Sequence, residues 1–254
     1  MKRIENIFYT ADHHPSRVLD LYLPDGDVEA VFLYFHGGGL ERGIKHSDSC
    51  HSIGATLAQH GIAFASAAYR LYPNAKYPDF IEDAADAVAW AKRELGAYTS
   101  CKKLFVGGSS AGGYLSMMLC FDPHYLADRG LHHANDITGY VHDAGQPTCH
   151  FNVLRERGMD TRRVIIDESA SLWHIGTSPT YAPMLLIVSD NDMKNRYEQT
   201  NLTLSTLRHF DYDRNTIDLI EAHGNHCAYV KQEENGENVF ANMILPFFHR
   251  FAQA

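Results

Sequence analysis

The chain has 254 residues, of which 45% are hydrophobic and 21% charged, and its formal net charge is −9. These values are typical of a globular α/β domain that buries a sizeable core. So negative a surface would be repelled by nucleic-acid phosphates, which argues against a nucleic-acid partner. We expect no membrane contact either, because no run of about 18 apolar residues occurs and Met1–Asn6 lacks the apolar core of a signal peptide.

The cysteines and histidines show no pattern of disulfides or metal ligands. The five cysteines are an odd number without CxxC spacing, which suits a reducing cytoplasm. The 16 histidines include adjacent pairs but no HExxH sequence. We therefore expect a cytoplasmic protein without a metal ion or other cofactor.

Hydrophobic patterning predicts strands alternating with helices in the first half of the chain. Residues 1–24 suggest two edge strands, the second alternating over 17–23 and stopped by Pro24. Residues 28–35 are almost continuously apolar, as in a strand buried on both faces. The expected elements that follow are a helix over 48–60, a strand over 62–69, a helix over 79–95 ended by Gly96, a strand from 103 and a helix over 111–121.

The second half repeats this alternation with one irregular stretch. A short strand is expected over 137–141, and residues 142–180 lack clean periodicity, which indicates an inserted lid. The remaining expected elements are strands over 183–189 and 216–220 and helices over 196–210 and 233–251. Together they predict a single α/β domain over residues 1–254, with a mostly parallel central sheet and helices on both faces.

The most informative stretch is the glycine-rich corner between the strand from 103 and the next helix. Gly108-Ser109-Ser110-Ala111-Gly112 matches G-x-S-x-G, a strained strand-to-helix turn that exposes its central serine. Glycines two residues to either side avoid clashes at such a turn. This spacing selects Ser110, because Ser109 would need a glycine at position 111.

Other polar groups follow the expected strands at their carboxyl ends, where sites in α/β sheets lie. The strand 28–35 runs into His36-Gly37-Gly38-Gly39, whose glycines present backbone N–H groups without side-chain cover. Later strand ends carry Asp190 or Asp192 and His223 or His226. A serine nucleophile needs a histidine base, and the histidine needs a carboxylate to orient it.

The order serine, acid, histidine and four motifs carry a family resemblance. The motifs are His36-Gly37-Gly38-Gly39, Tyr69–Pro73 followed by Pro78, Gly108–Gly113, and Pro183–Val188 followed by Asp192. With them the chain resembles the α/β-hydrolase superfamily, and more closely the hormone-sensitive-lipase-like esterases. The resemblance implies an α/β-hydrolase fold and an oxyanion hole formed by the N–H groups of Gly38, Gly39 and Ala111.

The resemblance also favours one residue of each pair of candidates for the acid and the base. It implies Asp192 as the acid and His226 as the base, with Asp190 and His223 as the competitors. Two features depart from the lipase-like pattern: Ser109 stands where Asp usually precedes the nucleophile, and the segment before His36 is too short for the usual helical cap. These departures shift the resemblance toward small bacterial carboxylesterases of the acetyl esterase type.

The functional expectation is a serine carboxylesterase for short-chain acyl esters, including acylated sugars. Its partner is a small-molecule ester, and the oligomeric state stays open. We expect Tyr114, Trp173 and His174 to bind substrate, the last two from the lid. An amidase, an arylformamidase or a peptidase on the same scaffold is the alternative. A non-catalytic binding protein is less favoured, because the serine, acid and histidine are all present.

Overall fold

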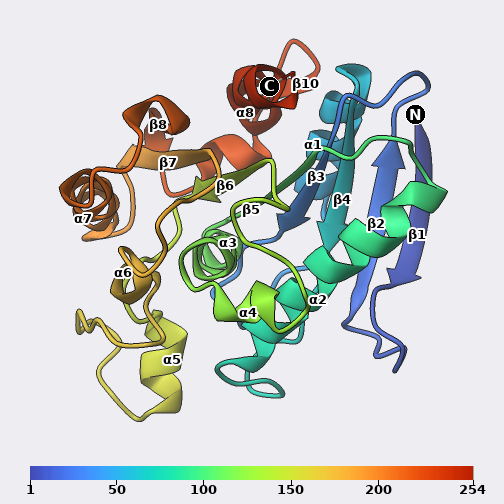
Figure 1. The fold of residues 1–254 in the computed structure, drawn as a ribbon. Coiled ribbons are helices and arrows are strands. Elements are labelled where there is room, and N and C mark those ends of the chain that lie inside the picture. The colour runs from blue at the N-terminus through green and yellow to red at the C-terminus, as the bar shows by residue number, and fades with distance from the viewer. Residues whose placement is uncertain (254) are drawn as a thin grey trace.

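The computed structural model describes residues 1–253 and shows one large sheet with helices on both faces (Figure 1). The strands are ordered β1-β2-β4-β3-β5-β6-β7-β8; β1, β2 and β4 pair antiparallel, and all pairs from β4–β3 to β7–β8 are parallel. Their bounds are β1 Lys2–Phe8, β2 Val18–Leu23, β3 Ala30–Phe35, β4 Ile62–Ala67, β5 Leu104–Ser109, β6 Gly139–Asp143, β7 Met184–Asn191 and β8 Ile217–Asn225.

The predicted alternation of strands and helices is confirmed, and with it the α/β-hydrolase fold. The helices are α1 Asp48–Gln59, α2 Asp79–Glu94, α3 Ala111–Phe121, α4 His124–Ala127, α5 Phe151–Glu156, α6 Ser171–His174, α7 Arg196–His209 and α8 Val239–Ala252. The short 3₁₀ turns are η1 Leu95–Ala97, η2 Arg214–Thr216 and η3 Ala228–Lys231. No helix within residues 1–253 has the length and hydropathy that a membrane span requires.

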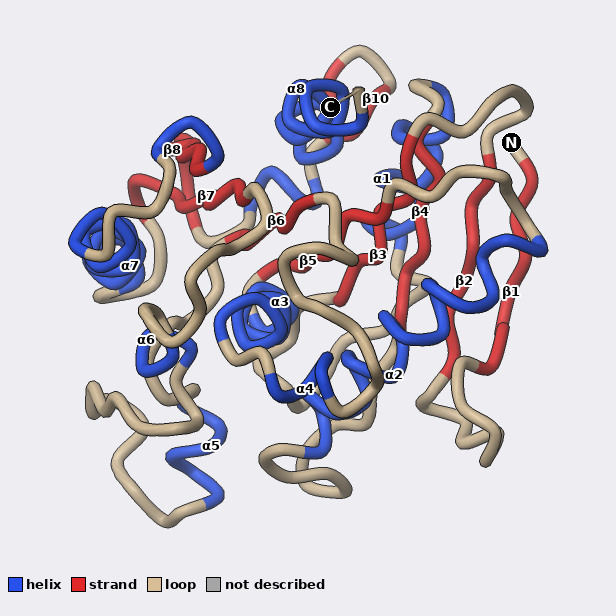
Figure 2. Tube along the Cα trace, in the orientation of Figure 1, coloured by secondary structure: helices blue, strands red, loops and turns tan. Residues whose placement is uncertain are grey.

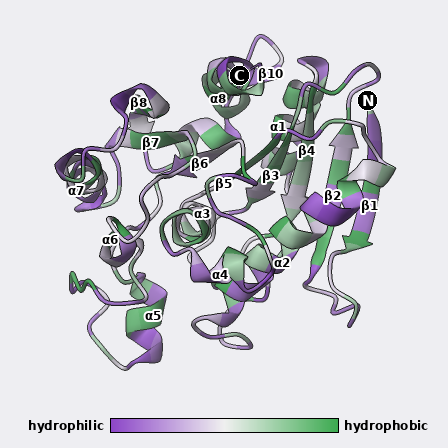
Figure 3. Cartoon of the chain, in the orientation of Figure 1, coloured by the Kyte–Doolittle hydropathy of each residue, from purple (hydrophilic) through white to green (hydrophobic). Residues whose placement is uncertain are grey.

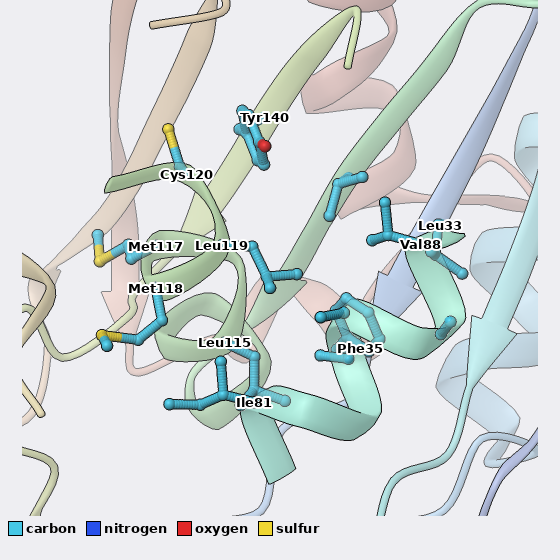
Figure 4. Close-up of a cluster of buried hydrophobic side chains, with 14 of the residues drawn as sticks. Leu33, Phe35, Ile81, Val88, Leu115, Met117, Met118, Leu119, Cys120 and Tyr140 are labelled. Atoms are coloured by element: carbon cyan, nitrogen blue, oxygen red, sulfur yellow. The ribbon is translucent and has the colours of Figure 1, made fainter. Parts of the chain in front are cut away.

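Two apolar layers hold the helices to the sheet. One layer packs α2 and α3 against β3; in Figure 4 Leu115 and Leu119 of α3 lie near Ile81 of α2 and Phe35 of β3. The second layer packs α1 and α8 on the other face. Hydrophobic residues are accordingly concentrated on the central strands (Figure 3). This double burial explains why β3 carries no charged residue and why every residue of β3 and β5 is buried.

Two expectations about the ends of the chain were wrong. The strand β2 is not an edge, since it lies between β1 and β4 and is wholly buried. The last helix begins at Val239 rather than at Glu233, because β9 (Glu233–Glu234) and β10 (Glu237–Asn238) form a hairpin first. Asn235 and Gly236 supply the two positive φ angles, 54° and 83°, that a two-residue turn needs.

The expected insertion also needs a new boundary. Its first two residues, His142 and Asp143, belong to β6, so the irregular segment begins at Ala144. Between β6 and β7 the chain is mostly loop with the short helices α5 and α6 (Figure 2). Val153 and Leu154 of α5 are buried in the layer of α2 and α3, which anchors this segment to the core.

Candidate active site

Ser110 occupies a strained corner between β5 and α3. Its φ of 57° and ψ of −111° lie outside the regions that a serine normally adopts. A Cβ on Gly108 would lie 2.4 Å from the carbonyl oxygen of Phe35, and one on Gly112 only 1.9 Å from the same atom. The corner is thus pressed against the end of β3, and only glycines allow that approach.

His226 and Asp192 extend from Ser110 in a chain of hydrogen bonds. The Ser110 hydroxyl lies 2.8 Å from Nε2 of His226, and Nδ1 of His226 lies 2.5 Å from Oδ1 of Asp192. The Asp192 carboxylate is fully buried and also accepts from the N–H groups of Ser189 and Met193. Burial alone would raise the pKa of Asp192, but the hydrogen bonds and the charge of His226 bring that pKa below its ordinary value. The carboxylate is therefore ionised at neutral pH.

Asp190 and His223, the alternative candidates for the acid and the base, form a separate pair on the surface. Nδ1 of His223 lies 2.6 Å from Oδ2 of Asp190, and the His223 side chain is 97% exposed. The pairing of β7 with β8 shifts register between Ser189 and Asn191. The two carboxylates differ in environment. The Asp190 side chain is half exposed, whereas the Asp192 side chain is buried and contacts His226, which in turn contacts Ser110.

The glycine loop after β3 lies against the same corner. Gly38 and Gly39 have φ angles of 127° and 67°, and a Cβ on Gly39 would lie 2.8 Å from the Phe151 ring. Within residues 1–253 no acceptor binds the N–H of either glycine. Ala111 is the first residue of α3, where a backbone N–H has no partner in its own helix. The structure thus shows no internal acceptor, within residues 1–253, for the three N–H groups expected to form the oxyanion hole.

The loop is held by a buried histidine. Nδ1 of His36 donates to the carbonyl oxygen of Gly37 at 2.8 Å, and the ring stacks on Tyr69 at 4.6 Å between centroids. Burial lowers the pKa of His36 to about 4, so the ring is neutral. The Tyr69 hydroxyl donates to the His36 carbonyl oxygen. This bracing keeps the following glycines close to Ser110.

Three buried residues near the site were missed by sequence reasoning. Asp143, at the end of β6, accepts the Ser110 N–H on its carbonyl oxygen at 2.7 Å, and its carboxyl group accepts from the Tyr229 hydroxyl. Arg196 donates to the carbonyl oxygen of Ala144 at 2.6 Å. The only available signal was the position of Asp143 just past an expected strand; Tyr229 and Arg196 belong to no motif.

A cleft with a volume of about 640 Å³ opens over Ser110 and His226. Its apolar lining includes Phe151, Met193 and Val230. Its lining side chains that carry charge are Glu41, Arg42, Arg155 and Lys231. No group of His, Cys, Asp and Glu side chains within residues 1–253 is arranged to hold a metal ion.

The three residues expected to bind substrate do not line this cleft. Tyr114 is buried one turn along α3, and its hydroxyl donates to the carbonyl oxygen of Ser169. His174 lies 3.3 Å from Asp122, and Trp173 is 58% exposed away from the cleft. The expectation was wrong because α6 packs against α3 behind the serine, whereas Phe151 and Arg155 of α5 reach the cleft instead.

The fold and this arrangement of side chains define an α/β-hydrolase. The chain belongs to the BD-FAE family, whose model matches residues 19–148. The matched region spans the glycine loop and the Ser110 corner, while Asp192 and His226 lie beyond it.

The chain is also similar to curated proteins over part of its length and to solved structures in fold. The esterase LipI of Mycobacterium tuberculosis is 37% identical over 103 residues, which are 38% of this chain and 30% of LipI. The gibberellin receptor GID1A of Arabidopsis thaliana is 28% identical over 152 residues, 56% of this chain and 40% of the receptor. The chain thus spans well under half the length of these curated relatives. A truncated carbohydrate esterase from gut microbiota superimposes with a TM-score of 0.79 at 17% identity, covering 100% of this chain and 97% of the other, a likeness of fold.

Proposed function

We propose that this chain is a serine carboxylesterase that hydrolyses short-chain acyl esters through an acyl-enzyme. The observation that most strongly supports this proposal is the chain of hydrogen bonds from Ser110 through His226 to Asp192. An isolated serine is a weak nucleophile at neutral pH, and a histidine at 2.8 Å is within range to accept its proton. In this proposal Ser110 is the nucleophile, His226 the base and Asp192 the orienting acid.

In the acylation step, the Ser110 oxygen attacks the ester carbonyl carbon while its proton moves to Nε2 of His226. The carbonyl oxygen gains negative charge and is met by the N–H groups of Gly38, Gly39 and Ala111. Removing one such donor typically costs about 10²–10³ in rate. The protonated His226 then gives its proton to the leaving alcohol oxygen, and the acyl group remains on Ser110.

In the deacylation step, His226 removes a proton from a water molecule, which attacks the acyl carbon. The second tetrahedral intermediate uses the same N–H groups, and the proton returns to the Ser110 oxygen as the acid leaves. Asp192 holds His226 in the tautomer that keeps Nε2 free to accept a proton in both steps. Because the Asp192 carboxylate is ionised, it also stabilises the imidazolium.

The substrate side of the proposal rests on the cleft. Its lining mixes Phe151 and Val230 with Ser47, Ser49 and charged residues, which suits a short acyl group and a polar alcohol better than a fatty tail. One protein of similar fold is a carbohydrate esterase, which supports acylated sugars as the alcohol class.

Two other functions remain candidates. An amidase or arylformamidase would use the same three side chains. A non-catalytic binding protein has a specific observation in its favour, the similarity to a gibberellin receptor. Against it stand the short contacts of His226 with Ser110 and Asp192, which a binding protein has no need to keep.

One set of experiments distinguishes these functions. Stoichiometric labelling by a fluorophosphonate that is lost in the Ser110→Ala variant is expected of a serine hydrolase; absent labelling favours the binding protein. Hydrolysis of p-nitrophenyl esters from acetyl to decanoyl, of acetylated sugars and of formyl-kynurenine then defines the bond. A kcat/KM for formyl-kynurenine well above that for every ester would replace the esterase with the amidase.

A further inference from the structure

The cleft over Ser110 carries more positive than negative charge, although the whole protein is acidic. Arg42, Arg155 and Lys231 line it, against Glu41 as its lining carboxylate. The formal net charge of the chain is −9. An anion therefore meets repulsion over most of the surface but attraction at this opening, and a cleft lined by one sign of charge concentrates ligands of the other sign.

The negative charge in the cleft is already neutralised. Arg155 of α5 forms an ion pair with Glu41 of the loop after β3. Arg42 and Lys231 have no hydrogen bond or ion pair to any side chain within residues 1–253. They come from two different walls, Arg42 from the loop after β3 and Lys231 from η3, the turn that follows His226. Two cations at the mouth thus remain free to bind a ligand.

We propose that the substrate is an ester that carries a carboxylate or similar anionic group, and that Arg42 and Lys231 bind this group. The inference rests on the proposed esterase function and names the substrate class within it. A guanidinium matches a carboxylate through two parallel hydrogen bonds, and an ammonium adds a point charge. Because both cations are exposed, each contributes a modest preference, and salt weakens it.

Two matched substrate pairs test the proposal and show which part of the ester bears the charge. The alcohol-side pair is 4-acetoxybenzoate and its methyl ester. The acyl-side pair is the 4-nitrophenyl monoester of succinate and 4-nitrophenyl butyrate. Each kcat/KM is divided by the second-order rate constant for hydroxide attack on the same compound. The reaction of the succinate monoester with its own carboxylate, which does not depend on hydroxide, is measured without protein and subtracted. We expect at least one anionic member to exceed its neutral partner, with the ratio falling as salt is added.

Charge-removing variants connect this preference to the two cations. Arg42→Gln and Lys231→Gln are each expected to lower the anionic-to-neutral ratio about two- to fivefold. Lys102→Gln is the matched control: it removes one exposed positive charge just before β5, at the opposite end of that strand from Ser110, and leaves the ratio unchanged. A neutral preference in the unmodified protein, or equal ratios in all variants, overturns the proposal.

A binding measurement separates this proposal from the esterase function. In the Ser110→Ala variant, calorimetry compares 4-acetoxybenzoate with its methyl ester, and tighter binding of the anion supports the charged cleft where hydrolysis is too slow to measure. If Ser110 hydrolyses neutral esters and the protein shows no preference for anionic ones, the inference about Arg42 and Lys231 is wrong and the proposed esterase function stands. If the protein binds the anion more tightly but shows no hydrolysis that depends on Ser110, the proposed esterase function is wrong and the anion-binding cleft stands.

Discussion

The hydroxyl of Tyr229 donates a hydrogen bond to the carboxyl group of Asp143, and both side chains are buried beside the strand end that leads to Ser110. The second carboxyl oxygen of Asp143 has no hydrogen-bond partner within residues 1–253. Burial raises the pKa of Asp143 from 3.8 to about 6. A second acidic group, distinct from Asp192, therefore lies next to the nucleophile in a site that water does not reach.

This buried carboxyl predicts a specific dependence of stability on pH. The folded protein holds the Asp143 proton more tightly than the unfolded chain, so its contribution is most favourable below about pH 4 and is lost as the pH rises through about 6. Relative to Asp143→Asn, the free energy of unfolding of the unmodified protein should fall by up to about 3 kcal/mol between pH 4 and pH 7. Urea unfolding at several pH values measures this difference, and parallel curves for the two proteins contradict the assignment.

Replacement of the nucleophile should separate the two adjacent serines. Ser110→Ala is expected to reduce kcat by about 10⁶, as loss of a triad nucleophile does. Ser109→Ala should retain at least about a tenth of the activity, because the hydroxyl next to His226 is that of Ser110. Esterase assays of both purified variants test this, and an equal loss in both would refute the assignment of Ser110.

The carboxylates of Asp190, in β7, and Asp192, just after it, should differ sharply in their effect on catalysis. Asp192→Asn is expected to lower kcat by about 10⁴, since an amide favours the wrong tautomer of His226. Asp190→Asn should cost less than about tenfold, because Asp190 pairs with the exposed His223. Steady-state kinetics of both variants decide the matter, and a larger loss for Asp190→Asn would reassign the acid.

The glycine beneath the corner should be irreplaceable. In Gly112→Ala the new Cβ would lie 1.9 Å from the carbonyl oxygen of Phe35, so β3 or α3 must move. We expect a loss of about 1–3 kcal/mol in stability together with most of the activity. Gly26→Ala is the control, because no atom lies within 4 Å of its Cβ, and its stability should change by less than about 0.5 kcal/mol. Thermal unfolding of the two variants measures the contrast.

Much of this protein could be predicted from local sequence. Three features depend only on residues close together in the chain. They are the apolar segment at residues 28–35, the glycines around Ser110 and the helix from Ala111 to Phe121. A strand buried on both faces must be apolar, and a strained corner must be flanked by glycines. These local requirements were enough to predict the α/β class and to choose Ser110 over Ser109.

Other features depend on how distant segments meet, and no local pattern records that. Asp190 lies at the end of β7 and Asp192 just after it, and the pairing of β7 with β8 shifts register at this point. Tyr114, Trp173 and His174 were wrongly expected in the cleft, because periodicity does not tell which side of α3 an irregular segment packs against. Asp143 and Tyr229 are 86 positions apart, so only the folded chain makes them neighbours. A side chain's burial and charge environment are set by contacts across the sheet, which is why the acid at Asp143 and the free cations of the cleft emerge only in three dimensions.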